Sequence, residues 1–341
     1  MDIGIRPARP AMRPWVRRLG WMVALLVWLP LALWWGGPRY HGGPDAPQAR
    51  PQPPADVRAL PDWLAQQEAQ VPGLRPDAAK RIVWHGEPGR RAPWAVVYLH
   101  GFTATRAETH PLAARVAQAL GAHLYEARLS GHGQDGTALA RATMQQWLAD
   151  GVEALRIGHA LGERVLVIGT STGATLAAWL AQHPDAAGVP MARQVWISPN
   201  FGPQDKRTEW LLGPWGRQIA HIVTGGTVGT PSEDPRIEAA WTRVYPVEAL
   251  LPMMALVQRV REGDWARVRT PVLVLFSPAD RTVDPALTQA VVARLPPGVA
   301  TLEAVTDSTD AEQHVLAGEL RSPGTTERLA ERIVRWAQAT P

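Results

Sequence analysis

A serine lies in a glycine-rich hinge between two apolar runs. Residues 165–168, Val-Leu-Val-Ile, are typical of a strand buried on both faces, and residues 174–180, rich in alanine and leucine, of a helix. Between them, residues 169–173 read Gly-Thr-Ser-Thr-Gly and match G-x-S-x-G, a sharp turn that exposes a nucleophilic serine. Ser171 is therefore the candidate nucleophile. The competing interpretation is an ordinary turn with a serine helix cap.

A serine hydroxyl needs a general base, and the base needs a carboxylate that orients it. His314 lies in the loop after the last expected strand, at the sheet edge where we expect Ser171. Asp280 follows the expected strand 271–277, which gives the chain order Ser, Asp, His. Asp284 is the competing carboxylate, but it directly precedes a proline and is expected to cap the next helix.

The other histidines and acidic residues near these positions are expected to be structural or solvated. Asp307 and Asp310 are close to the candidate base in sequence and are interpreted as solvated loop residues. We expect five histidines to lie in helices, at strand edges or in the cap and to be structural: His110, His123, His159, His183 and His221.

Acyl transfer also requires hydrogen-bond donors for a developing oxyanion. The backbone N–H of Thr172 is one candidate donor, and the backbone N–H of Phe102 is the other. Phe102 belongs to the loop after the first buried strand, in which Gly101 permits a close approach of the backbone. We expect His100, Gly101 and Thr103 of this loop to contact the substrate.

Strands and helices alternate along most of the chain. Strands are predicted at 94–99, 124–129, 165–168, 194–198, 271–277 and 300–305, and helices at 108–120, 143–161, 174–183, 285–295 and 324–338. This alternation predicts an α/β fold with a mostly parallel, doubly wound sheet. The tryptophan-rich insertion 201–268 is interpreted as a helical cap over the carboxyl ends of the strands; the alternative is that its tryptophans pack into the main core.

Composition excludes several classes of function. The chain has 341 residues and a net charge of +4, but residues 1–40 carry six arginines and one aspartate, so the remainder has a net charge of −1. No basic stripe interleaved with aromatic residues lies in that remainder, which argues against nucleic-acid binding. The absence of cysteine excludes disulfides and a cysteine nucleophile. No H-E-x-x-H motif or cluster of metal ligands is found, so a metal enzyme is not expected.

The N-terminal region has the pattern of a membrane segment. Residues 19–35 are apolar and uncharged and follow Arg17 and Arg18, which predicts an uncleaved single-span anchor within residues 1–36. The alternative is a cleaved signal peptide, for which no A-x-A site follows the apolar run. Residues 37–61 are rich in proline and glycine and are interpreted as a linker, so one folded domain is expected at 62–341.

Together these motifs resemble the α/β-hydrolase superfamily, in the branch of bacterial carboxylesterases and monoacylglycerol lipases or lysophospholipases. The segments that carry the resemblance are HGF at 100–102, RLSGHG at 128–133, GTSTG at 169–173, Asp280 with Val283, and His314 with Val315. The resemblance implies an α/β-hydrolase fold, a Ser-His-Asp mechanism without a cofactor and a mobile cap that shapes the acyl pocket.

The resulting expectation is a serine hydrolase that cleaves small carboxylic esters with an apolar acyl group. Its catalytic domain would lie on the periplasmic side of a bacterial inner membrane, or be secreted after signal cleavage. Two alternatives remain open: an acyltransferase or thioesterase with the same triad, and a non-catalytic, membrane-anchored binding protein on a hydrolase fold.

Overall fold

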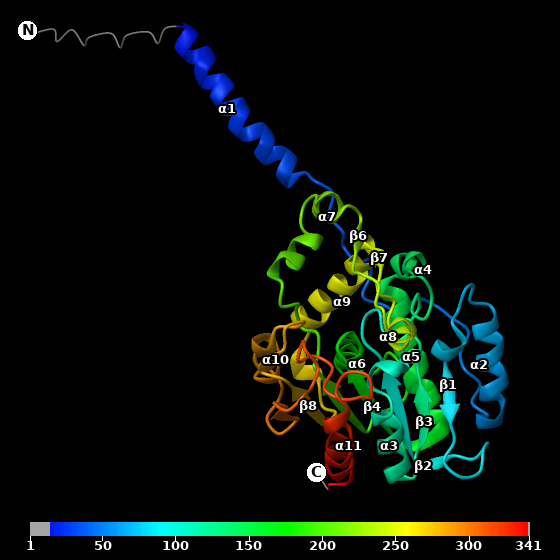
Figure 1. Ribbon diagram of the computed structural model, residues 1–341. Helices are drawn as coiled ribbons and strands as arrows, with labels where there is room; N and C mark the ends of the chain where they lie inside the picture. Colours follow the sequence, from blue (N-terminus) through cyan, green and yellow to red (C-terminus); the bar gives the residue numbers. More distant parts are fainter. Residues whose placement is uncertain (1–13, 340–341) are drawn as a thin grey trace, which may run out of the picture.

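A seven-stranded sheet forms the centre of the computed structural model, which describes residues 14–339 (Figure 1). Its order is β1-β3-β2-β4-β5-β8-β9. The strands are β1 Arg81–Val83, β2 Ala92–Leu99, β3 His123–Glu126, β4 Gly162–Thr170, β5 Arg193–Ile197, β8 Val272–Phe276 and β9 Ala300–Ala304. Only β1 at one edge runs antiparallel to its neighbour. The predicted α/β fold with a mostly parallel sheet is therefore confirmed.

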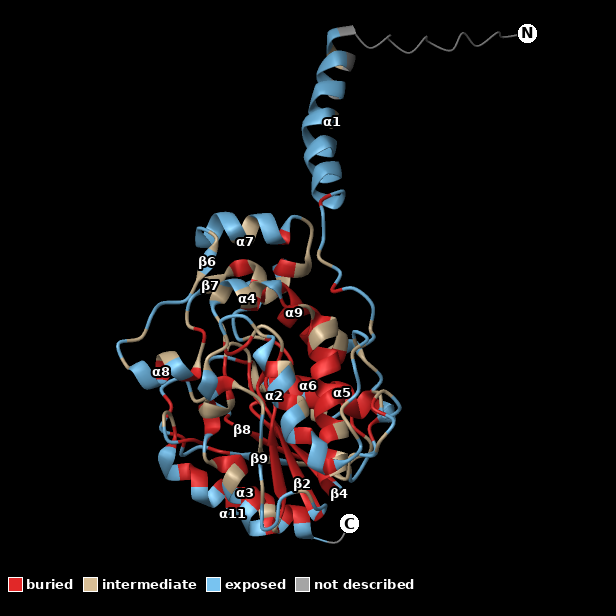
Figure 2. Ribbon diagram, turned by 90° about the vertical axis from the view of Figure 1, so that its right-hand side faces the viewer, coloured by how far each residue is buried: buried red, intermediate tan, exposed pale blue. Residues whose placement is uncertain are grey.

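Helices cover both faces of the sheet (Figure 2). On one face, α3 (Leu112–Leu120) and α11 (Pro323–Gln338) bury their apolar sides against the strands. On the other face, α5 (Met144–Leu161) and α6 (Thr172–Gln182) do the same. The remaining helices are α1 Pro14–Trp35, α2 Leu60–Ala69, α4 Gly136–Arg141, α7 Gly216–Thr224, α8 Pro235–Ala240, α9 Leu250–Glu262 and α10 Pro285–Val292.

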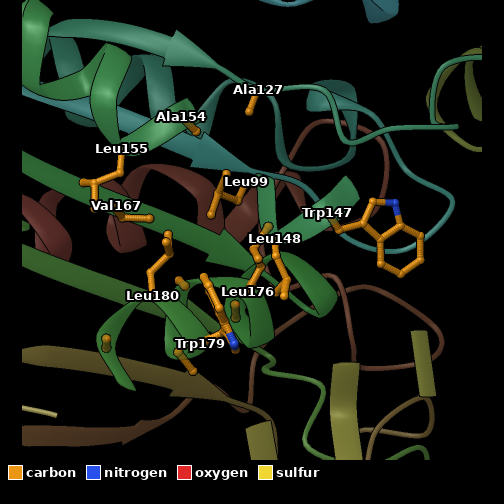
Figure 3. Packing of buried hydrophobic residues seen from close by; sticks show 14 of the residues in the cluster. Leu99, Ala127, Trp147, Leu148, Ala154, Leu155, Val167, Leu176, Trp179 and Leu180 are labelled. Atoms are coloured by element: carbon orange, nitrogen blue, oxygen red, sulfur yellow. The ribbon is translucent and has the colours of Figure 1, made fainter. Parts of the chain in front are cut away.

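The larger of the two cores holds the strands that carry the site. Leu99 of β2 and Val167 of β4 are fully buried, as is Leu176 of α6, and Figure 3 shows them together with Leu148 and Leu155 of α5. Each buried leucine contributes roughly 1.5–3 kcal/mol relative to an exposed one. This packing fixes the carboxyl ends of β2 and β4, from which the loop with Phe102 and the turn with Ser171 emerge.

The predicted helix 108–120 is two elements in the structure. A short 3₁₀ helix, η3 (Arg106–Thr109), is followed by α3, and Pro111 lies between them. The backbone of His110 is extended, because a proline disfavours the helical conformation in the residue before it. The break turns η3 back toward the end of β2.

The insertion 201–268 between β5 and β8 divides into two parts. Its first part contains η4 (Lys206–Leu212), α7, the small hairpin of β6 (Thr227–Val228) and β7 (Tyr245–Pro246), and α8. Trp210 there is 70% exposed. In the second part, α9 packs on α6 and Trp265 is only 2% exposed within the main core. Trp265 of the second part therefore packs into the main core, as the alternative interpretation expects, whereas a cap formed by the first part stays a prediction.

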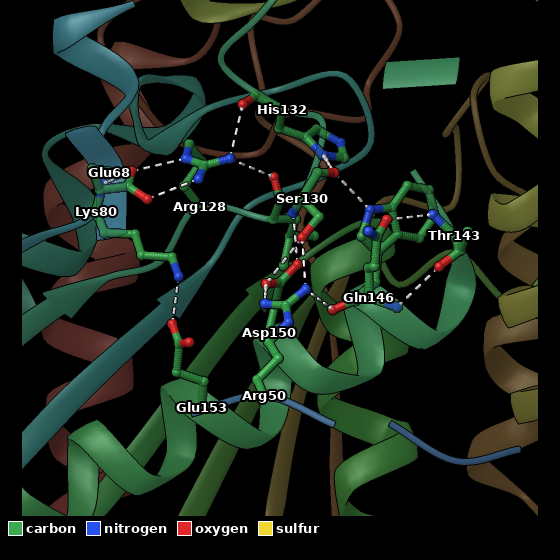
Figure 4. Close-up of polar contacts among 12 residues, drawn as sticks. Arg50, Glu68, Lys80, Arg128, Ser130, His132, Thr143, Gln146, Asp150 and Glu153 are labelled. Atoms are coloured by element: carbon green, nitrogen blue, oxygen red, sulfur yellow. Dashed lines mark hydrogen bonds and ion pairs between the residues drawn. The ribbon is translucent and has the colours of Figure 1, made fainter. Parts of the chain in front are cut away.

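Residues 37–55, which we call the N-terminal strap, do not form the free linker that composition predicts. The strap is extended, but it lies along the surface of the folded domain. The indole N–H of Trp179 donates to Asp45 at 2.8 Å, and Arg50 forms an ion pair with the buried carboxylate of Asp150 (Figure 4). The folded domain therefore begins before residue 62, because long-range polar contacts hold this proline-rich segment.

The apolar N-terminal run forms α1, a helix of 22 residues with Pro30 inside it. Figure 1 shows α1 projecting from the body next to α7. The indole N–H of Trp215 donates to the carbonyl of Leu33 at 2.9 Å, and its backbone N–H donates to that of Pro38 at 2.9 Å. Among residues 14–339, no helix combines the length and the apolar character that crossing a membrane requires, so the anchor predicted within residues 1–36 is not supported. Residues 1–13 of the predicted basic leader lie outside the described residues.

Candidate active site

Ser171 occupies a sharp turn between β4 and α6. Its backbone angles, φ 52° and ψ −117°, lie in a region that residues other than glycine rarely adopt. Both flanking glycines are required by close packing. A side-chain carbon added to Gly173 would lie 2.1 Å from the carbonyl oxygen of Leu99, and one added to Gly169 would lie 2.5 Å from that of Gly173. The predicted strand–serine–helix turn is thus present, and it places the serine at the carboxyl edge of the sheet.

His314 and Asp280 meet although 34 residues separate them. The ring Nδ1–H of His314 donates to Oδ2 of Asp280 at 2.8 Å. The other carboxylate oxygen of Asp280 accepts the backbone N–H groups of Thr282 at 2.8 Å and Val283 at 2.9 Å. These donors hold the carboxylate in one orientation, so the imidazole is fixed with its Nε2 free of Asp280.

Asp284, the competing carboxylate, serves a different purpose. Its Oδ1 accepts the backbone N–H of Ala286 at 2.8 Å and caps α10, and its Oδ2 forms an ion pair with Lys206. It makes no hydrogen bond to His314 among the contacts of the described residues. The expectation of a helix cap at this position agrees with the structure.

Asp310 differs from its predicted role as a solvated loop residue. It is buried, and its Oδ2 accepts the backbone N–H groups of His314 and Val315, each at 3.0 Å. The carboxylate therefore holds the backbone of the loop that carries the candidate base. The exposed Asp307 instead pairs with Arg328.

Ser171 and His314 line the same cavity, of about 360 Å³. Its wall also includes Gly101, Phe102 and Thr103 of the loop after β2. Residues of the insertion 201–268 also line it, among them Thr208, Trp241, Tyr245, Leu250 and Met253. Within residues 14–339, no group of three or more His, Asp or Glu side chains is arranged to hold a metal ion.

The two predicted oxyanion donors belong to Thr172, which directly follows the serine, and to Phe102, which lines the same cavity. Thr172 is the first residue of α6, and its N–H lies at the positive end of the helix dipole. Neither this N–H nor that of Phe102 donates a hydrogen bond to another group in the described part of the chain. Both N–H groups are therefore without a protein partner among the described residues, and their role as oxyanion donors stays a prediction.

His100 does not contact the cavity as the sequence predicts. Its ring is fully buried, its Nε2 accepts the backbone N–H of Leu129 at 3.0 Å, and its Nδ1–H donates to the carbonyl of Gly101 at 2.9 Å. Burial lowers the pKa of His100 to about 4, so the ring is neutral. The histidine braces the backbone of the loop, because both ring nitrogens are used inside the protein.

Glu108 is a buried carboxyl group that the sequence interpretation missed. It lies in η3, is 3% exposed, and lines the cavity together with Ser171. Burial raises its pKa to about 7, although hydrogen bonds from Gly101 and Tyr98 and the nearby charge of His314 lower it. No local signal marked this residue, since the helix predicted over 108–120 placed it in an ordinary first turn.

Comparisons with known proteins agree with this architecture. A family model described as "Alpha/beta hydrolase family" matches residues 96–317. A thermostable monoacylglycerol lipase from Bacillus sp. (strain H-257) is 28% identical over 203 residues, which cover 57% of this chain and 73% of the lipase.

Solved structures with the same fold include lipolytic enzymes. A structure from a study of the metagenome-derived lipolytic enzymes LipS and LipT has a TM-score of 0.58 at 20% identity and covers 78% of this chain and 99% of its own. The monoacylglycerol lipase of Paleococcus ferrophilus has a TM-score of 0.54 at 16% identity, with 76% and 97% covered. At these identities the likeness shows the fold. Taken with the family match, it means that this chain belongs to the alpha/beta hydrolase family and is similar to its lipases and esterases.

Proposed function

We propose that this chain hydrolyses carboxylic esters through Ser171, His314 and Asp280. The observation that carries the proposal is a cavity lined both by Ser171, in its strained turn, and by His314, whose Nδ1–H is held by a buried carboxylate. This arrangement has the parts that a serine hydrolase needs: a nucleophile, a base and a group that orients the base. The similarity to lipases supports an ester as the bond that is cut.

The reaction proceeds in two halves. Nε2 of His314 takes the proton of the Ser171 hydroxyl while the serine oxygen forms a bond to the ester carbonyl carbon. The N–H groups of Phe102 and Thr172 stabilise the oxyanion, and Asp280 stabilises the imidazolium. The imidazolium then protonates the departing alcohol as the carbon–oxygen bond breaks. Water repeats these steps on the acyl-enzyme and releases the carboxylic acid.

A second cavity supports an apolar acyl group as part of the substrate. It has a volume of about 450 Å³ and lies between η4 and α7, where Leu211, Ile219 and Val223 line it. Thr208 and Leu250 line both this cavity and the one that contains Ser171. An acyl chain bound to the serine therefore has an apolar space within reach, past these two side chains.

Activity-based labelling tests the proposal. The wild-type chain should hydrolyse p-nitrophenyl esters and react with a fluorophosphonate probe, whereas Ser171→Ala should keep the same melting temperature and lose both reactions. Thr170→Ser is a matched control one position before the nucleophile. A Ser171→Ala variant that is still labelled and active would show that the nucleophile lies elsewhere. Added alcohols as acceptors distinguish hydrolysis from acyl transfer.

Location outside the cytoplasm is part of the proposal. An arginine-rich start followed by an apolar run is a pattern that export signals and anchors share. Fractionation of cells that express the tagged full chain should recover esterase activity outside the cytoplasmic fraction. Activity confined to the cytoplasm would refute this part and leave the chemistry unaffected.

A further inference from the structure

Glu108 makes contacts that the proposed chemistry does not use. Its Oε1 accepts two hydrogen bonds, from the backbone N–H of Gly101 at 2.6 Å and from the hydroxyl of Tyr98 at 2.8 Å. No hydrogen bond to its Oε2 occurs among the described residues, and the side chain lines the catalytic cavity. Placing a carboxyl group in such a buried position costs free energy, so its partners indicate what it does.

The partner Gly101 sits directly before the Phe102 peptide. The carbonyl of Gly101 accepts the Nδ1–H of His100 at 2.9 Å and the backbone N–H of Ala104 at 3.2 Å. Because the peptide unit is planar and trans, fixing this carbonyl aims the Phe102 N–H in the opposite direction. Glu108 holds the N–H on the other side of Gly101. Gly101, the residue before the Phe102 donor, is therefore held both at its N–H and at its carbonyl.

Glu108 also adjoins the nucleophile and the loop of the base. A side-chain carbon added to Gly101 would lie 2.9 Å from Glu108 Oε2 and 3.2 Å from the Cβ of Ser171, so the carboxyl and the serine flank the same small space. In the loop after His314, a carbon added to Gly318 would lie 2.7 Å from the carbonyl oxygen of Glu108. The segment η3 thus contacts the oxyanion loop and the loop after His314, and its carboxyl lines the cavity beside Ser171.

We propose that Glu108 is a positioning residue, which accepts the N–H of Gly101 and thereby aims the Phe102 N–H at the oxyanion. The inference rests on the proposed ester hydrolysis. It assigns the carboxyl no contact with the reacting atoms. The acceptor oxygen is the essential feature, so an amide in the same place should serve, and an apolar side chain of the same size should not.

Two substitutions separate the acceptor from the side-chain volume. Glu108→Gln keeps an oxygen for Gly101 and Tyr98, whereas Glu108→Met keeps the length and removes the acceptor. With p-nitrophenyl butyrate, Glu108→Met should lose kcat by about 10²-fold, approaching the loss of an oxyanion donor, while KM changes by less than about threefold. Glu108→Gln should stay within about tenfold of the wild type.

The inhibition constant of a trifluoromethyl ketone distinguishes a positioning role of Glu108 from a purely structural one, because a purely structural role would leave this constant unchanged. Its adduct with Ser171 carries an oxyanion, so its inhibition constant should rise with Glu108→Met in proportion to the loss of kcat. Glu153→Met is the matched control, because Glu153 is also buried but pairs with Lys80 away from the cavity. Glu153→Met should lower the melting temperature and leave kcat and the inhibition constant unchanged.

Three results would overturn the inference: unchanged kcat in Glu108→Met, unchanged affinity for the ketone despite a lower kcat, or a Glu108→Gln variant as impaired as Glu108→Met. If Glu108→Met does not fold, Glu108→Asp replaces it, since the shorter side chain withdraws the acceptor by about 1.5 Å and should lose kcat in the same way. A wild-type chain without esterase activity would instead refute the proposed function itself.

Discussion

Replacing Asp280 by asparagine should disable the base without disturbing the fold. An asparagine side chain must direct its NH₂ group either at His314 or at the two backbone N–H groups of Thr282 and Val283. The second orientation would set donors against donors and lose two hydrogen bonds of 2.8 and 2.9 Å, each worth about 1 kcal/mol. The amide oxygen therefore stays with the backbone, and the NH₂ group donates to Nδ1 of His314.

This orientation puts the imidazole in the wrong tautomer. With Nδ1 as an acceptor, the ring proton lies on Nε2, which is the atom that must accept the proton of Ser171. The same substitution in serine proteases lowers kcat about 10⁴-fold. We expect a loss of this size, equivalent to about 5 kcal/mol in the activation free energy.

The matched control is Asp284→Asn, four residues further along the same loop. Asparagine also caps helices well, and the ion pair with the half-exposed Lys206 contributes little, so kcat should stay within about threefold of the wild type. Steady-state hydrolysis of p-nitrophenyl butyrate and the rate of fluorophosphonate labelling measure both variants. Retention of activity by Asp280→Asn, or an equal loss in Asp284→Asn, would refute the assignment of the orienting carboxylate.

Three further predictions concern burial, the strap and the acyl cavity. The pKa of Glu108 is about 7 in the folded protein and 4.5 in the unfolded reference, so the wild type loses stability as pH rises from 4.5 through 7. Glu108→Gln cannot ionise at this position. In urea unfolding it should therefore be more stable than the wild type by on the order of 3 kcal/mol at pH 8, and by little at pH 4.5. Equal differences at both pH values would contradict this reasoning. Burial lowers the pKa of His100 to about 4, and because this residue is the same in both variants its contribution cancels in the comparison. Arg50→Ala leaves the buried Asp150 carboxylate without its cation and should lower the free energy of unfolding, measured in urea, by about 2–3 kcal/mol. The control Arg58→Ala removes one partner of an exposed ion pair and should leave the melting temperature unchanged. A similar result for both variants would mean that the strap contributes no stability. Leu250 lines both cavities, so Leu250→Trp should hinder an acyl chain that extends from one into the other and lower kcat/KM for a laurate ester about tenfold or more relative to an acetate ester. A parallel change for both esters would refute the use of the second cavity by the acyl chain.

The parts of the site that the sequence predicts are those with a local signal. The glycines of GTSTG are readable because a sharp turn excludes side chains, and the structure places carbonyl oxygens where their Cβ atoms would be. Asp284 is readable as a cap because it precedes a proline at the start of a helix. The requirements at Gly169 and Asp284 are set by neighbours within a few positions, whereas Leu99, whose carbonyl oxygen excludes a side chain at Gly173, belongs to a neighbouring strand.

The missed residues have partners far away along the chain or depend on a turn of the backbone. Asp310 resembles any acidic loop residue, yet its carboxylate is buried beneath the backbone of His314. Glu108 reads as the first turn of a helix, and only the break before Pro111 turns it back to Gly101. The strap reads as a linker by composition, although Arg50 meets a carboxylate 100 positions away.

The sequence by itself determined the alternation of strands and helices and the position of the turn that holds Ser171, because hydrophobic periodicity and the pattern of a short turn motif are local properties of the chain. Only the tertiary structure decided which carboxylate meets His314, what holds the oxyanion loop, and where the N-terminal strap lies. Those contacts join residues far apart along the chain, and their formation depends on how the sheet and its covering helices pack, which no short segment encodes.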